Sequence, residues 1–130
     1  MNLRSPLSYV LGSGSAKEGT DHFWGQRVSA VALAILGIWF LFSLVTMTGA
    51  DFDYVGLANW MGLTSNSVML ILLVLTLAYH SGLGIEVIIE DYVHGPFLKV
   101  VSLIFSKFAH VAVASGAIFA VLKLAFGANG

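Results

Sequence analysis

Two long runs of uncharged residues constrain this chain more than any other feature. No residue from Val28 to Ala50 carries a formal charge, and none does from Val68 to Ile85. About 20 predominantly apolar residues in a helix are enough to cross the ~30 Å hydrocarbon core of a bilayer. A third apolar segment, about Val100 to Leu122, is interrupted by Lys107 and His110. The sequence therefore predicts an all-α membrane protein with three transmembrane helices.

Composition agrees with this class and narrows the chemistry. The 130 residues are 58% hydrophobic and only 10% charged, with a mean hydropathy of +0.89, outside the range of soluble globular domains. A net charge of −1 provides no basic field for nucleic acid. Cysteine is absent, so any metal ligands in this chain would be His, carboxylate, Tyr or Met. We divide the chain into a polar leader, residues 1–26, and an anchor, residues 27–130, with spans at about 28–50, 68–90 and 98–123.

The cationic residues that flank the spans predict the orientation. Arg4, Lys17 and Arg27 come before the first span, and Lys99 follows the second. The connection from Ala50 to Ser67 contains no Lys or Arg. Under the positive-inside rule, the N-terminus and the connection around Lys99 face the cytoplasm or matrix.

His80 is a titratable side chain inside the second span. Placing a polar group in the hydrocarbon core costs free energy, so a residue of this kind is a candidate functional residue. It could be a buried histidine that hydrogen-bonds a neighbouring helix, a proton relay or an axial haem ligand. Gly84, one turn further on, removes side-chain bulk where a flat macrocycle would have to lie. At about 100° per residue, Asp91 lies only about 20° from His80 around the helix and about 16 Å along it.

The polar residues near the cytoplasmic boundary each have two interpretations. Asp91 and Tyr92 are either ordinary interfacial residues or a quinone site, in which a phenol donates a hydrogen bond and a carboxylate relays protons. Asp21, His22 and Arg27 are either a solvated leader with a positive anchor or a site for an anionic group. On the third span, His110 is the main competing metal ligand, and it shares a helix face with Lys107.

Three sequence blocks resemble one known family. They are Arg27-Val-Ser-Ala at the start of the first span, Tyr79-His80-Ser-Gly-Leu-Gly-Ile in the second, and Ile89-Glu90-Asp91-Tyr92-Val93 at its end. Together with the three-span pattern, they resemble the small hydrophobic membrane-anchor subunit, or D-type chain, of succinate dehydrogenase (complex II). The leader departs from that family in reading Asp21-His22-Phe23, where members can show His-Asp-Phe.

The resemblance implies a succinate:quinone oxidoreductase in which this chain is part of a two-chain anchor bundle. Its partners would be a flavoprotein, an iron–sulfur protein and a larger cytochrome b-type anchor subunit. His80 would supply one axial ligand to a b-type haem, and Arg27 and His22 would neutralise haem propionates. Tyr92, with Asp91 beside it, would bind ubiquinone or menaquinone. The complex would lie in the bacterial inner membrane, with a mitochondrial inner membrane as the second choice.

Two other functions stay open. One is a haem-free anchor of the fumarate reductase type. The other is a small proton-conducting channel or transporter subunit that uses His80, Glu86, Glu90 and Asp91. Succinate oxidation itself is not expected on this chain, which has no flavin site and no polar pocket for a dicarboxylate.

Overall fold

The computed structural model describes residues 14–48 and 53–127, with side chains from Gly19 onward in the first range. Helix α2 (Gly14–Thr48) is followed by the short α3 (Tyr54–Gly62), then α4 (Thr64–Tyr92) and α5 (Pro96–Gly127). The helices α2, α4 and α5 are each long and apolar enough to cross a membrane, as the sequence predicted. Arg4, Asp51 and the side chain of Lys17 lie outside the described residues.

The start of α2 and the presence of α3 differ from the prediction. Helix α2 begins at Gly14, inside the segment assigned to the polar leader, so the first span continues as helix well beyond its apolar part. Helix α3 lies in the connection expected to be a loop. It is started by Asp53, whose side chain accepts a hydrogen bond of 2.7 Å from the backbone N–H of Gly56. Such an N-cap satisfies a backbone donor that the first turn of a helix leaves unpaired.

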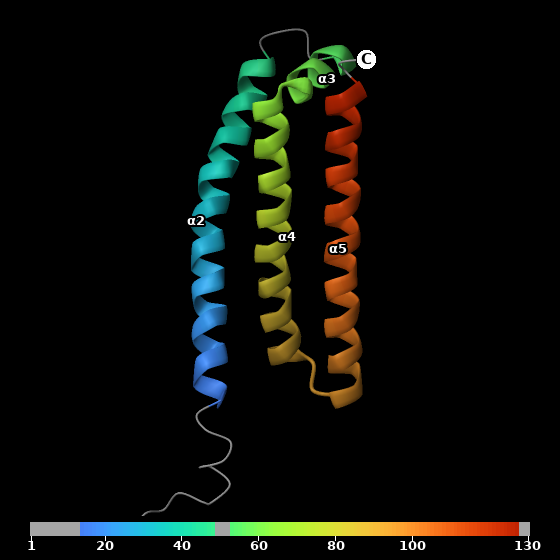
Figure 1. Cartoon of the computed structure of the whole chain (residues 1–130). Coiled ribbons are helices and arrows are strands. Elements are labelled where there is room, and N and C mark those ends of the chain that lie inside the picture. Colours follow the sequence, from blue (N-terminus) through green and yellow to red (C-terminus); the bar gives the residue numbers. More distant parts are fainter. Residues whose placement is uncertain (1–13, 49–52, 128–130) are drawn as a thin grey trace, which may run out of the picture.

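The three long helices lie side by side, with α4 between α2 and α5 (Figure 1). Helix α4 packs against both neighbours, and α3 packs on α4 and α5 at the end away from the α4–α5 connection. Trp60 of α3 also stacks on Trp39 of α2, with ring centroids 5.9 Å apart. Pro96 begins α5, where its missing N–H costs no hydrogen bond.

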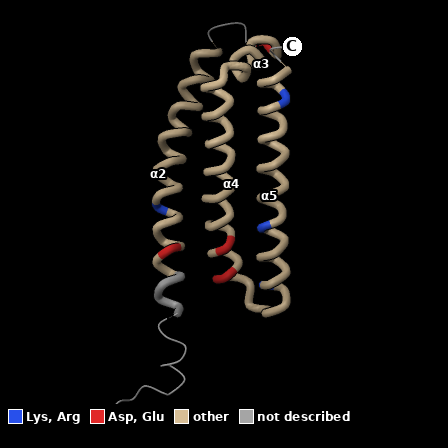
Figure 2. The backbone as a smooth tube through the Cα atoms, in the orientation of Figure 1, with Lys and Arg blue, Asp and Glu red and all other residues tan. Residues whose placement is uncertain are grey.

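Charged residues gather toward the helix ends and leave a long uncharged middle (Figure 2). On α2 and α4 the middle is uncharged from Val28 to Thr48 and from Thr64 to Ile85. On α5 the charge-free part begins after Lys107. This distribution is the one that a bilayer requires of a spanning helix.

The described helices bury little of their own apolar surface. The apolar side chains below a tenth exposed are Leu36, Leu70, Val121 and Ala125. Large apolar side chains on all three spans are well exposed, for example Phe42 at 70% and Phe105 at 74%. Because a single layer of helices has two open faces, lipid or a further membrane chain must cover them.

We expect this chain, expressed alone, to be poorly folded in detergent, because so few of its side chains pack against one another. Size-exclusion chromatography and limited proteolysis would show aggregation and rapid cleavage. Co-expression with a second anchor chain should restore a protease-resistant species. A monodisperse, protease-resistant chain with full helicity in isolation would contradict this expectation.

Candidate functional site: a histidine between two helices and an exposed pair at the helix end

His80 lies on the side of α4 that faces α2. Its Nδ1 is 2.8 Å from the hydroxyl oxygen of Ser29, which is only 4% exposed. Ser29 also donates a hydrogen bond of 3.1 Å to the carbonyl of Gln26 in its own helix. The half-buried His80 therefore makes a cross-helix contact within a helix that is long and apolar enough to span a membrane.

The approach of α2 to α4 is close at this level. A Cβ added to Gly25, one turn before Ser29, would lie 2.6 Å from the hydroxyl oxygen of Tyr79. Any side chain at Gly25 would therefore displace Tyr79, the neighbour of His80. Glycine at this position lets the two helices come together where Ser29 contacts the imidazole.

The glycines that follow His80 have different surroundings. A Cβ on Gly84 would meet no atom within 4 Å, so the space that the sequence analysis assigned to a macrocycle is open in this chain. A Cβ on Gly82 would instead lie 3.8 Å from Cδ2 of His110. Gly82 thus serves helix packing, whereas Gly84 borders space on nearly the same face as His80.

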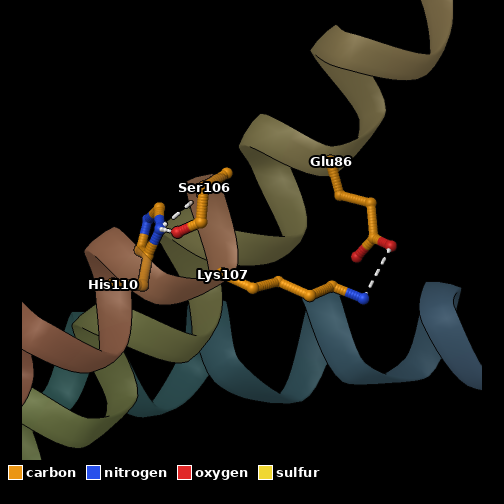
Figure 3. A network of polar contacts seen from close by, with 4 residues as sticks. All are labelled: Glu86, Ser106, Lys107 and His110. Carbon is orange, nitrogen blue, oxygen red and sulfur yellow. Dashed lines mark hydrogen bonds and ion pairs between the residues drawn. The ribbon is translucent and has the colours of Figure 1, made fainter. Parts of the chain in front are cut away.

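His110 belongs to a separate polar cluster between α4 and α5 (Figure 3). Its Nδ1 donates a hydrogen bond of 2.7 Å to the carbonyl of Ser106, one turn earlier in α5. Lys107 Nζ lies 3.6 Å from Glu86 Oε1 of α4. Both charged groups lie within predicted spans. An ion pair there lowers the free-energy cost of moving the two charges from water into the membrane. His110, Lys107 and Glu86 line one groove of about 360 Å³, which supports the prediction that His110 and Lys107 share a face.

A single-file proton path of His80, Glu86, Glu90 and Asp91 is not assembled in the described part of the chain. His80 contacts α2, whereas Glu86 contacts α5. The carbonyl of Glu90 accepts a hydrogen bond of 2.9 Å from Lys99, and its carboxylate is exposed. This arrangement does not favour the channel hypothesis.

Asp91 and Tyr92, predicted at the membrane boundary, lie at the C-terminal end of α4. Tyr92 is the last residue of the helix and is 77% exposed, and Asp91 is exposed beside it. His94 Nδ1 donates a 2.9 Å hydrogen bond to the Tyr92 carbonyl, which helps to end the helix. Both side chains are thus accessible to a ligand or to another subunit.

His22 and Arg27 are the ninth and fourteenth residues of the 35-residue α2. The Arg27 guanidinium stands 4.5 Å from the centre of the Phe23 ring, a cation–π contact that leaves most of its donors available. Arg27 is exposed, and His22 is half-buried. Arg27 thus lies two residues before Ser29, which contacts His80, and His22 lies five residues before Arg27.

Comparison with known proteins identifies the family. The profile of the succinate dehydrogenase/fumarate reductase transmembrane subunit matches residues 1–122. The chain belongs to that family. A succinate dehydrogenase hydrophobic membrane anchor subunit from Paracoccus denitrificans is 32% identical over 98% of this chain and 97% of its own length. No solved structure matches the chain.

Relatives from two other organisms give the same result. The hydrophobic membrane anchor subunit of succinate dehydrogenase from Rickettsia bellii is 31% identical over 71% of this chain and 72% of its own. The membrane anchor subunit from Reclinomonas americana is 34% identical over 67% of this chain and 73% of its own. The resemblance stated from the sequence is thus confirmed, and this anchor chain is part of an oxidoreductase complex.

Sequence reasoning missed the partner of His80. Ser29 was part of the block that resembled the family, yet a serine in an apolar span gives no signal of its own. Whether Ser29 contacts another helix depends on how α2 is rotated about its axis relative to α4, and no local sequence pattern specifies that rotation. The Glu86–Lys107 pair was missed for the same reason.

Proposed function

We propose that this chain is the small anchor of a succinate:quinone oxidoreductase, where it helps to bind a b-type haem and a quinone. The observation that carries the proposal is the environment of His80. An imidazole within a predicted span contacts a neighbouring helix through Nδ1, and open space lies one turn away at Gly84. Metal-ligating histidines are held in this way through their second nitrogen.

The residues of this chain fit one axial position of a haem. Among the described residues, no three His, Asp or Glu side chains gather into a metal-binding group. A single imidazole suits a cofactor whose remaining ligands come from a porphyrin and from the larger anchor subunit. When bound, the haem would supply one-electron storage. Arg27 and His22 would hold propionates at the membrane surface.

Tyr92 and Asp91 are proposed to bind the quinone head group. The Tyr92 hydroxyl can donate a hydrogen bond to a carbonyl oxygen, and Asp91 can take a proton from water and pass it to the site. Both side chains are exposed at the end of α4. That end also carries the connection to α5, which is predicted to face the cytoplasm, where a soluble iron–sulfur subunit could deliver electrons.

The exposed faces of the helix layer support partner binding. We propose that the larger cytochrome b-type anchor covers one face, and that the iron–sulfur and flavoprotein subunits dock at the end with Tyr92. The Paracoccus and Rickettsia relatives favour a bacterial inner membrane, with the N-terminus in the cytoplasm under the positive-inside rule.

Purification of the complex through a tag on this chain tests the proposal. We expect the preparation to contain all four subunits, to reduce quinone with succinate and to give a b-type band in its reduced-minus-oxidised visible spectrum. An active complex without that band would support a haem-free anchor instead. A preparation without the flavoprotein and iron–sulfur subunits would contradict the proposed assembly.

A further inference from the structure

Ser29 differs from the other buried serines of the described residues. Ser43 and Ser67 are also buried, but their hydroxyl groups donate to backbone carbonyls near them in the chain. The Ser29 hydroxyl contacts a side chain on another helix, His80. A buried hydroxyl that reaches across a helix interface has a role beyond satisfying its own helix.

The hydrogen bonds of Ser29 are compatible with a proton on Nδ1 of His80. A serine hydroxyl has one proton and two lone pairs. Its proton goes to the Gln26 carbonyl at 3.1 Å. In that arrangement the oxygen accepts from His80 Nδ1–H at 2.8 Å. This arrangement corresponds to the Nδ1–H tautomer, which leaves the lone pair on Nε2 for a ligand, whereas donation from the hydroxyl to Nδ1 would correspond to the other tautomer.

A comparison within the chain shows why a cross-helix partner matters. His110 donates from Nδ1 to the carbonyl one turn earlier in its own helix, so its ring orientation is set locally. The ring of His80 is instead oriented by α2. Because Gly25 permits the close approach of α2 to Tyr79, the position of Ser29 relative to His80 depends on the packing of these two helices.

We propose that Ser29 is the positioning residue of the haem ligand: its hydroxyl holds His80 in the Nδ1–H tautomer and fixes the plane of the ring. The inference rests on the proposed role of His80. A hydrogen bond accepted from Nδ1–H makes Nε2 more basic, which strengthens the bond to iron and favours the ferric state. Ser29 would thus set both haem retention and haem potential without touching the haem.

The test uses variants of the whole purified complex. In Ser29→Ala we expect haem to be lost about 10- to 100-fold more readily, as is typical when such an outer partner is removed. The haem retained should have a higher midpoint potential. Ser43→Ala, which removes another buried hydroxyl of α2, should match the wild type. Equal potential and equal haem retention in Ser29→Ala and Ser43→Ala would overturn the inference.

A second pair of variants separates orientation from packing. Ser29→Thr and Ser29→Val have nearly the same shape, and only Thr keeps the hydroxyl. We expect Thr to preserve the haem potential and Val to raise it, with both complexes assembled to the same subunit ratio and thermal stability. Identical potentials in this pair would refute the role of the hydroxyl even if Ser29→Ala fails to assemble. If the haem spectrum of the His80→Ala complex is unchanged, the proposed role of His80 fails together with this inference. If only the haem potential of the Ser29→Val complex is unchanged, this inference alone is overturned.

Discussion

Replacing His80 by Ala is expected to remove the low-spin, bis-imidazole character of the haem in the assembled complex, whereas His110→Ala should preserve it. His80 is oriented by another helix and has open space one turn away. His110 lies against Gly82 in the α4–α5 contact and beside the Glu86–Lys107 pair. Loss of an axial ligand is the largest single change that this chain could impose on the spectrum.

The two variants control for each other, because each removes one imidazole from a predicted span. Visible and EPR spectra of the oxidised complexes report the axial ligands of the haem in each variant. Haem that remains in His80→Ala with an altered spectrum would agree with a ligand and packing supplied by a partner chain. Loss of bis-imidazole character in His110→Ala alone would show that the assignment is wrong.

Tyr92→Phe is expected to lower succinate–quinone reductase activity several-fold or more. The change removes one hydroxyl at the exposed end of α4 and keeps the ring. A lost hydrogen bond typically costs about 0.5–1.5 kcal/mol, and more where the acceptor gains charge in the reaction. Since about 1.4 kcal/mol corresponds to a tenfold change in rate, this range corresponds to a loss of about two- to tenfold, and the charge gained by the quinone moves the expected loss to the upper part of the range or beyond it.

Two controls isolate the quinone step. Succinate oxidation with a soluble dye that accepts electrons before the membrane should stay near the wild-type rate in Tyr92→Phe. Tyr54→Phe removes a hydroxyl from a similarly exposed tyrosine, 73% exposed, at the opposite end of the layer, and should leave both activities unchanged. Normal quinone reduction by an assembled Tyr92→Phe complex would make Tyr92 an interfacial residue only.

The spans could be predicted from the sequence because hydropathy is a local property. Two uncharged runs and a third apolar segment, interrupted by Lys107 and His110, predicted the three long helices. Helix α3 was missed because its signal is short: the Asp53 cap is followed by only nine helical residues. The helical leader was missed because a polar composition does not by itself prevent a helix from continuing.

The contacts between helices could not be predicted, because they depend on how each helix is rotated. At about 100° per residue, Glu86 lies well away from His80 around α4, yet this spacing does not show that Lys107 faces Glu86. Ser29 and His80 are 51 residues apart in the sequence. Likewise, the sequence does not show that Gly82 lies against His110 of α5 whereas Gly84 borders open space.

His80→Met tests most directly whether His80 ligates the haem iron. A thioether in place of one imidazole should convert a bis-histidine site into a His–Met site with a higher potential. Near-infrared magnetic circular dichroism of the oxidised complex distinguishes these two ligand sets. We predict that the bis-histidine band is lost in His80→Met. An unchanged bis-histidine band in the assembled His80→Met complex would contradict the assignment.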